Sequence, residues 1–148
     1  MYLRIPVSRD VESIVEMINN VLTSWKPMVI VVDSINVLME NVEDPNKRAW
    51  LQNYFYSLSE IINGVAVLIA EIPLGGAVIG LGSIEFVADA VIILKHRIEG
   101  GLLARTMEIR KMRGAPITIS EFPFTITAKK GIEVFIPPIL AEIRKPGR

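Results

Sequence analysis

The sequence predicts an α/β fold, built on a mainly parallel sheet with flanking helices and with antiparallel hairpins near its C-terminal end. Two continuous apolar runs, Met28–Val32 and Val65–Ile69, have the pattern of strands that are buried on both faces of a parallel sheet. A segment with helical periodicity precedes each run, so helices and strands alternate. After residue 90, turn residues separate further strands. The 148 residues fit a single domain spanning residues 1–148.

The two helices are predicted from apolar residues that recur every three to four positions. Ser8 is placed to cap the first helix, and Trp25-Lys26-Pro27 ends it. Asp44-Pro45 begins the second helix, because Asp is a good N-cap and Pro fits the first helical position, and Asn63-Gly64 closes it. The apolar positions are Val11, Ile14, Val15, Ile18, Val21 and Leu22 in the first helix and Leu51, Tyr54, Phe55, Leu58, Ile61 and Ile62 in the second.

The remaining strands are predicted from short apolar segments and from the turns between them. Gly100-Gly101 marks the turn of one hairpin, and Lys129-Lys130-Gly131 marks the turn of a second. The strand segments are Tyr2–Val7, Val87–Leu94 (which enters the first hairpin as Ala90–Arg97), Leu102–Arg113, Phe124–Thr127 and Ile132–Ile136.

Composition excludes several classes of protein. The chain has no Cys and one His, which excludes a disulfide framework, a Cys nucleophile and a His cluster for zinc. Residues 64–84 carry a single charge, Glu71, and are long enough to cross a bilayer. Glu71, Pro73 and four glycines are unfavourable there, so we expect a strand followed by a glycine-rich loop, no membrane association and a cytoplasmic location.

The zero net charge of the chain conceals an uneven distribution. Residues 31–94 carry eight acids and two bases, whereas residues 95–114 carry six bases and two acids. An anionic partner is therefore expected at the basic segment. Binding of nucleic acid through residues 95–113 is possible but not favoured, because no aromatic residue lies between Phe86 and Phe122 to stack on bases.

Two acids follow the apolar strand runs directly. Asp33 comes after Val29-Ile30-Val31-Val32, and Glu71 comes after Val67-Leu68-Ile69-Ala70. Ligands of open parallel sheets bind beyond the carboxyl ends of the strands. An Asp after four apolar residues has the form of a Walker B element, whose carboxylate holds Mg²⁺, often through water. A turn or cap residue fits the same pattern, and the strand ends alone leave both interpretations open.

The segment GLGSIEFVADAVIILKHRIEGGLLARTMEIRKMRG, residues 80–114, resembles the KaiC-like branch of the RecA superfamily of ATPases. The resemblance includes an Ala-Asp-x-Val-Ile-x-Leu strand, a hairpin, and a strand that ends in Lys-x-Arg-Gly. It continues through Pro123–Thr127 and Lys130–Val134, and the segment VIVVDS at residues 29–34 is similar to the Walker B strand of that family.

The resemblance implies roles for five residues. Asp33 would be the Walker B carboxylate, which holds Mg²⁺ through water when nucleotide is present, and Ser34 and Glu71 would lie beside the nucleotide. Lys111 and Arg113 match a pair that reaches the γ-phosphate on a neighbouring subunit in hexameric members. Since residues two apart in a strand share a face, both cations can approach one anion. An edge strand protected by positive charge is the alternative.

The phosphate loop of that family, G-x-x-x-x-G-K-[ST], is absent, because none of the ten glycines precedes a Lys. The glycines at 75–82 therefore do not form such a loop. The family's catalytic glutamates also fall upstream of the region that matches. We accordingly expect no cofactor in the isolated chain, and ATP with Mg²⁺ only alongside a partner that supplies a P-loop.

In this superfamily the P-loop strand lies between the strands that match Val65–Ile69 and Val87–Leu94, so its absence implies two unpaired edges. Each unsatisfied buried backbone group costs roughly 1–3 kcal/mol. Three arrangements would satisfy these edges. The two strands could pair directly with each other, another strand of the chain could insert between them, or a second chain could supply that strand. We expect pairing between chains, in a homo-oligomer or with a P-loop-containing partner.

Two functions remain open for this sequence besides nucleic-acid binding. The first is a truncated or degenerate KaiC-like domain that does not bind or hydrolyse ATP alone and acts as an oligomeric assembly or regulatory module. The second is half of a split ATPase, which supplies Asp33 and the pair Lys111/Arg113 to a P-loop partner. His96 is assigned no role.

Overall fold

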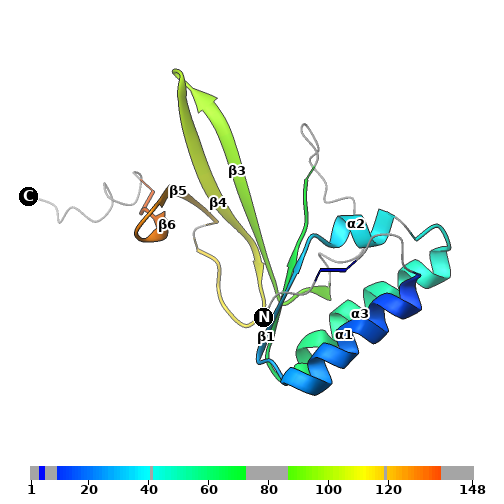
Figure 1. Cartoon of the computed structure of the whole chain (residues 1–148). Helices are drawn as coiled ribbons and strands as arrows, with labels where there is room; N and C mark the ends of the chain where they lie inside the picture. The colour runs from blue at the N-terminus through cyan, green and yellow to red at the C-terminus, as the bar shows by residue number, and fades with distance from the viewer. Residues whose placement is uncertain (1–3, 6–9, 41, 73–86, 119, 138–148) are drawn as a thin grey trace, which may run out of the picture. The chain divides into compact units, whose positions relative to one another are not determined.

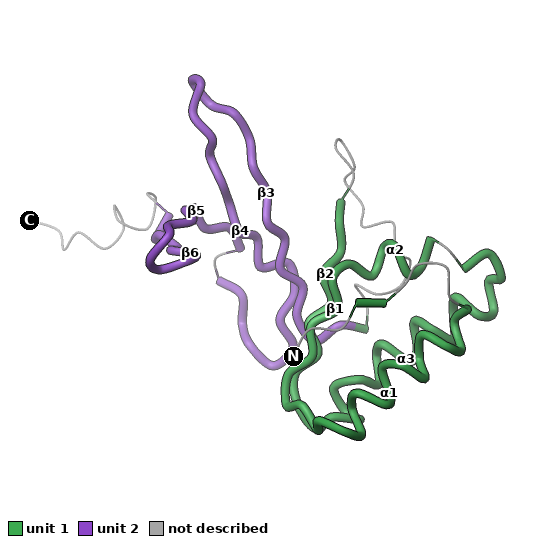
Figure 2. The backbone as a smooth tube through the Cα atoms, in the orientation of Figure 1, with its two compact units in different colours: residues 1–87 green, residues 88–148 purple. Residues whose placement is uncertain are grey.

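The computed structural model describes residues 4–5, 10–40, 42–72, 87–118 and 120–137 (Figure 1). The chain forms two compact units, residues 1–87 and residues 88–148 (Figure 2). Each unit is described by itself below.

The first unit alternates helices and strands, as the sequence predicts. Its two strands, β1 and β2, pair in parallel, and the register runs from Val29 opposite Val65 to Asp33 opposite Ile69. The short helix α2 was not predicted, because six residues are too few for a periodic apolar pattern. The elements in order are α1 (Val11–Trp25), β1 (Val29–Asp33), α2 (Ile35–Glu40), α3 (Pro45–Ile62) and β2 (Val65–Ile69).

Side chains of the predicted type cap the long helices, with one correction. Asp10, not Ser8, caps α1, since its Oδ1 accepts a hydrogen bond of 2.8 Å from the Ser13 amide; Ser8 lies outside the described residues. Asp44 caps α3 as predicted and accepts a 2.8 Å bond from the Asn46 amide. Asn63 ends α3 with φ +47°, the left-handed conformation that helix C-caps favour.

The core of this unit lies between the helices and one face of the β1–β2 pair. Ile35, Leu51, Phe55 and Leu58 are fully buried. Alternate strand residues pack against this core, namely Ile30, Val32, Ala66 and Leu68. The opposite face is exposed, although the apolar runs predicted burial on both faces. Its side chains are Val29, Val31, Val65, Val67 and Ile69, with exposed fractions from 39% to 57%.

The second unit is an antiparallel meander in the order β3-β4-β5-β6. The two predicted hairpins are present, with Gly100 and Gly101 at the first turn at φ +55° and +80°, values that suit glycine. The first strand starts at Ala90 instead of Val87. The strands are β3 (Ala90–Glu99), β4 (Leu102–Met112), β5 (Glu121–Thr127) and β6 (Gly131–Val134). Together with the parallel pair, they confirm the predicted α/β class.

A β-bulge interrupts the long β3–β4 hairpin. Ile92 faces Ile109, but the next pair is Val91 with Lys111, so Arg110 is the extra residue of β4. Such an insertion moves every later side chain of its strand to the other face. Lys111 therefore lies on the face of Val91, and not on the face of Ile109.

Among the described residues, β2 and β3 each have one edge without a partner strand. Direct closure of the two strands on each other is not observed, because β2 and β3 belong to separate sheets. Among the described residues, no strand pairs with the edge of β2 that faces away from β1. The predicted strand Tyr2–Val7, apart from residues 4–5, and the glycine loop at 75–82 lie outside the described residues. No helix in the described part of the chain is long and apolar enough to cross a membrane.

The start of β2 depends on a glycine. The Val65 amide donates a 2.9 Å hydrogen bond to the Met28 carbonyl, and a Cβ on Gly64 would lie 2.1 Å from the same oxygen. We expect Gly64→Ala to lower the free energy of unfolding by about 2–4 kcal/mol, because two backbone segments must separate. Urea unfolding followed by circular dichroism measures this change.

Gly100→Asn is the matched control for that substitution. A Cβ at Gly100 meets nothing within 4 Å, and its φ of +55° is accessible to Asn. We expect a change within about 0.5 kcal/mol. Equal stability of Gly64→Ala and the unsubstituted chain would contradict the close approach of Gly64 to Met28.

Candidate functional site

Asp33 lies at the carboxyl end of β1, on the uncovered face of the strand pair. Its position alternates with Ile30 and Val32, which pack on the core, so its side chain shares the exposed side with Val29 and Val31. The peptide bond between Asp33 and Ser34 is cis. Asp33 is exposed and Ser34 is half-buried. The carboxylate is therefore accessible to a ligand that approaches the end of the sheet.

Asn36 connects the segment after β1 to the segment after β2. Its Nδ2 donates a 3.1 Å hydrogen bond to the Glu71 carbonyl, and its Oδ1 accepts a 2.8 Å bond from the Glu71 amide. The parallel register already places Asp33 opposite Ile69, two residues before Glu71. The Asn36 side chain thus fixes the main chain of Glu71 at the same end of the sheet as Asp33.

The acids at this end do not form a metal centre by themselves. No group of three or more His, Cys, Asp or Glu residues in the described ranges is placed to hold a metal ion. Mg²⁺ is octahedral and is commonly held by one or two carboxylates together with substrate phosphates and water. The chemistry of Asp33 therefore fits Mg²⁺ that arrives with a phosphate ligand.

The other two candidate residues, Lys111 and Arg113, lie in the second unit. Lys111 is half-buried near the end of β4, and Arg113 is exposed just beyond it. The ladder continues past the bulge, since Met112 faces Ala90 and the Arg113 amide donates a 2.7 Å bond to the Asp89 carbonyl. Lys111 and Arg113 therefore share a face of the hairpin, as their spacing predicts.

Arg113 already has a partner in this structure. Its Nη1 donates to Asp89 Oδ1 at 2.8 Å, and both side chains are more than 60% exposed. An exposed pair of this kind contributes little, about 0–1 kcal/mol. Asp89 can therefore release the guanidinium to a phosphate at a small cost. This acid was not singled out from the sequence.

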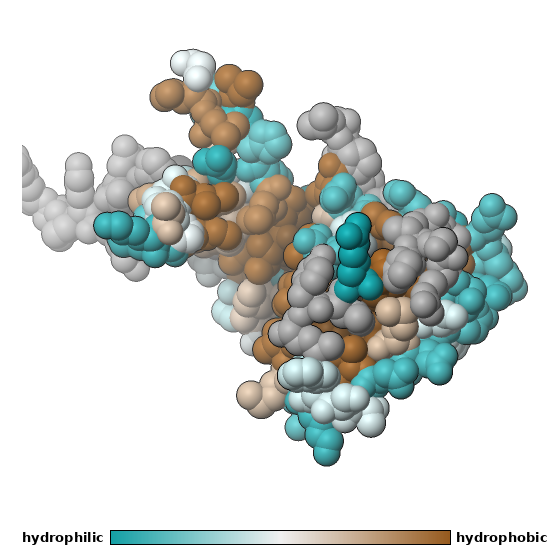
Figure 3. Space-filling view, in the orientation of Figure 1, coloured by the Kyte–Doolittle hydropathy of each residue, from teal (hydrophilic) through white to brown (hydrophobic). Residues whose placement is uncertain are grey.

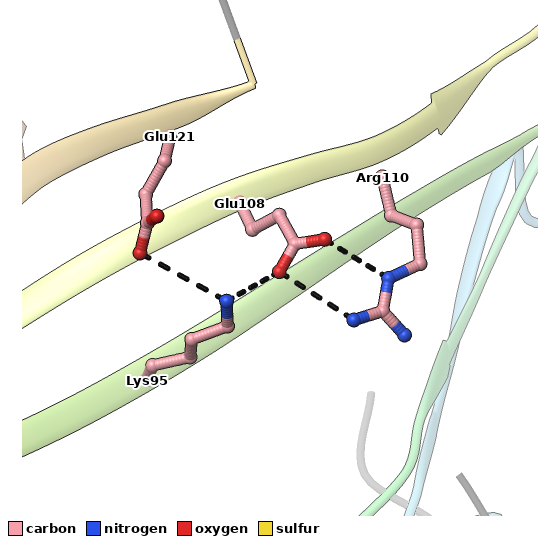
Figure 4. Close-up of polar contacts among 4 residues, drawn as sticks. All are labelled: Lys95, Glu108, Arg110 and Glu121. Carbon is pink, nitrogen blue, oxygen red and sulfur yellow. Dashed lines mark hydrogen bonds and ion pairs between the residues drawn. The ribbon is translucent and has the colours of Figure 1, made fainter. Parts of the chain in front are cut away.

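The same face of the hairpin carries an ion-pair network of four residues (Figure 4). Glu108 of β4 accepts hydrogen bonds from Arg110 Nε at 3.0 Å and is 2.5 Å from Lys95 Nζ of β3. Lys95 also lies 3.9 Å from Glu121 of β5. The Arg110 guanidinium and the Lys95 ammonium hold the pKa of Glu108 below its usual value. The network thus connects three strands.

Comparison with solved structures identifies the class of the fold. A crystal structure of a KaiC-like protein from the hyperthermophilic archaeon Pyrococcus horikoshii superposes with a TM-score of 0.71 at 25% identity, over 86% of this chain and 57% of that one. The helix-covered parallel strands and the antiparallel meander are therefore those of a RecA-like ATPase domain.

The sequence comparisons then identify the family. The KaiC ATPase family model matches residues 4–138. The circadian clock oscillator protein KaiC of Synechococcus elongatus is 30% identical over 85% of this chain, and circadian clock protein KaiC3 of a Synechocystis strain is 33% identical over 92%. The chain belongs to the KaiC family of ATPases. It spans about a quarter of the length of these two relatives, 24% and 27%.

Two contacts that shape the candidate site were missed in the sequence. Asn36 follows Asp33 by three residues, and nothing in its local pattern shows that its amide reaches residue 71. Asp89 faces Arg113 only because of the bulge, since counting back evenly from the Gly100-Gly101 turn pairs Arg113 with Ala88. A search for polar residues beside the strand ends would have found Asn36 as a candidate.

The Asn36 contact predicts a local change at Glu71. In Asn36→Ala both hydrogen bonds to the Glu71 main chain are lost, each contributing about 1 kcal/mol. We expect amide hydrogen exchange at Glu71 to become at least about tenfold faster, as NMR would measure. Asn19→Ala, which loses a bond to the Tyr54 hydroxyl instead, is the control and leaves Glu71 unchanged. Unchanged exchange at Glu71 in Asn36→Ala would refute the role of the amide.

The lowered pKa of Glu108 predicts a pH-dependent contribution to stability. We expect Glu108→Gln to lower the free energy of unfolding by roughly 1 kcal/mol at pH 7, where the carboxylate is charged. Because the folded pKa lies below the unfolded value of about 4.3, this contribution is complete above that pH and disappears as pH falls through the folded pKa. Urea unfolding at pH 7 and at pH 3 measures both values.

Glu99→Gln is the control for this effect. Glu99 pairs with Arg97 on the same face at 2.7 Å, but both side chains are about 60% exposed. We expect this substitution to change the stability only slightly at either pH. A pH-independent loss in Glu108→Gln would show that packing, and not charge, explains it.

Proposed function

We propose that this polypeptide acts as a non-catalytic KaiC-like module in an assembly and does not bind or hydrolyse ATP alone. The observation that carries the proposal is the open side of the β1–β2 pair. Five apolar side chains cover this face, and the outer edge of β2 has no partner strand in the part of the chain that the structure describes. Both features lie next to Asp33.

The sequence supports the lack of independent nucleotide binding. A P-loop binds phosphates with a row of backbone N–H groups and a Lys, and no Gly-Lys pair occurs in these 148 residues. Asp33 is a single exposed carboxylate, and the closest acid along the neighbouring strand is Glu71. One or two carboxylates without phosphate ligands give Mg²⁺ a weak site.

The open side of the strand pair supports the assembly role. Parallel sheets are stable when both faces are covered, and a two-stranded sheet is marginal in water. Burying the exposed halves of Val29, Val31, Val65, Val67 and Ile69 would each contribute on the order of 1 kcal/mol. The partner is a further copy of this chain or a P-loop-containing chain that adds a strand beside β2.

A split ATPase is the second candidate function, and the placement of the charged residues favours it. Asp33 is exposed at a strand end in one unit, and Lys111 and Arg113 share one face of the hairpin in the other. In this reading a partner supplies the P-loop and the catalytic glutamate. This chain then supplies Asp33 as the magnesium-binding carboxylate. It also supplies the two cations, Lys111 and Arg113, that contact the γ-phosphate.

A titration of a fluorescent ATP analogue, with Mg²⁺, onto the pure chain tests the first proposal. We expect no saturable binding at micromolar concentrations, because the chain has no Gly-Lys pair of a P-loop and Asp33 is a single exposed carboxylate. Saturable binding in the micromolar range would overturn the proposal and reveal a phosphate site of another kind.

Mixing with a KaiC-like chain that has an intact P-loop separates the two candidates. The partner should lack its own Lys-x-Arg pair. A split ATPase predicts hydrolysis only in the mixture, reduced about 10³-fold or more in Lys111→Ala/Arg113→Ala, because these cations stabilise transferred phosphoryl charge. Lys129→Ala/Lys130→Ala, in the β5–β6 turn, is the control with the same change of charge. Complex formation without hydrolysis supports the assembly module.

A further inference from the structure

The β3–β4 hairpin has a second face that the nucleotide chemistry does not use. Opposite pairs on this face are Ile92 with Ile109, Leu94 with Met107, His96 with Arg105, and Ile98 with Leu103. The apolar members remain accessible, with exposed fractions of 53% at Ile92, 54% at Leu94, 78% at Ile98 and 50% at Leu103. Figure 3 shows apolar side chains near the free end of this hairpin.

The exposed parts of these side chains form an apolar patch as large as those that mark binding sites. Four branched residues that are half exposed or more present roughly 400 Å² of apolar surface, within the range of patches that mark binding sites. The opposite face differs, because it carries the Lys95–Glu108–Arg110 network and the Arg97–Glu99 pair. That face also carries the buried Val91 and Ile93 and the exposed Leu102. The two faces therefore differ in their ion pairs, and the face of Ile92 and Leu94 has most of its apolar side chains accessible.

A pair of basic residues interrupts the apolar face. Arg105 is half-buried and His96 lies directly opposite, between Leu94 and Ile98 along β3. Among the described residues, neither Arg105 nor His96 has a hydrogen bond or an ion pair. Cations on the other face do have acidic partners, namely Lys95, Arg97, Arg110 and Arg113. Arg105 is thus a half-buried arginine without an acidic partner among the described residues, and its neighbours on the same face of β4 are Leu103 and Met107.

This arrangement specifies the chemistry of a ligand. A guanidinium without an acidic partner can bind a carboxylate with two parallel hydrogen bonds. The apolar residues on both sides gain by contact with apolar side chains. We propose that this face of the β3–β4 hairpin docks an amphipathic helix of a partner protein, in which apolar residues flank a single carboxylate.

A second copy of the same face fits this surface less well. Face-to-face packing of two hairpins would bring Arg105 and His96 of one copy towards those of the other. Residues 88–148 carry eleven Lys and Arg against six Asp and Glu, so two such units repel each other overall. An acidic partner has the complementary charge. The proposal involves neither ATP nor the open edge of β2, and it is independent of the proposed function.

Two synthetic peptides test the proposal on the full chain. One is an 18-residue helix with a Leu stripe and a central Glu within the stripe (a length of about five turns), and the other has Gln in place of that Glu. Fluorescence anisotropy measures both affinities. We expect the Glu peptide to bind saturably and about tenfold more tightly than the Gln peptide, because only its carboxylate pairs with Arg105.

Matched variants assign the preference to one side chain. Arg105→Met keeps an unbranched apolar stem and is expected to bind the two peptides equally. Arg97→Met removes a cation from the other face of the same hairpin and is expected to keep the tenfold preference. Ile98→Ser/Leu103→Ser changes side chains that are half exposed or more, so folding is expected to persist while both peptides bind about tenfold more weakly.

Several outcomes would overturn the proposal. Equal affinities of the unsubstituted chain for the two peptides, or no saturable binding of the Glu peptide, would exclude carboxylate recognition. Equal loss of the preference in Arg97→Met and Arg105→Met would show general attraction by a basic unit. Self-association of the chain that Ile98→Ser/Leu103→Ser abolishes would assign the face to a second copy.

Discussion

The parallel pairing of β1 with β2 is the interaction on which the rest of the first unit depends. Its ladder begins at the Val65–Met28 hydrogen bond and ends with Asp33 opposite Ile69, so one register sets both the close approach at Gly64 and the position of the candidate carboxylate. The helices cover one face of this pair, and the other face remains apolar and exposed. The β1–β2 pair therefore both positions Asp33 and exposes an apolar face that another structural layer would cover.

The bulge at Arg110 has a comparable effect in the second unit. Without it, Lys111 would continue the apolar face of Ile109. One extra residue instead moves Lys111 and Arg113 to the face that carries Glu108, and it brings Arg113 opposite Asp89. The insertion keeps the apolar face free of these two cations. It therefore places Lys111 and Arg113 on the face opposite the surface around Arg105.

Helices, strands and turns, which depend on neighbouring residues, could be predicted from the sequence. Contacts between residues far apart in the sequence could not. Apolar runs and turn residues predicted strands β1 to β6 and the Gly100-Gly101 turn, and helical periodicity predicted the long helices, because each depends on local conformational preference. The Asn36–Glu71 contact joins residues 35 positions apart, and the bulge at Arg110 has no residue signature of its own. Continuous apolar runs predicted burial on two faces, but the described residues cover only one.

The charge of this neutral chain is divided unevenly between its two units. Residues 1–87 carry ten acids and five bases, and residues 88–148 carry the opposite excess. Within the basic unit, most cations on one face of the hairpin are paired locally, so their field is largely cancelled at short range. Arg105 lacks such a neighbour among the described residues and lies between Leu103 and Met107 along its face of β4. Recognition at this face therefore depends on the surroundings of one guanidinium more than on the net charge of the chain.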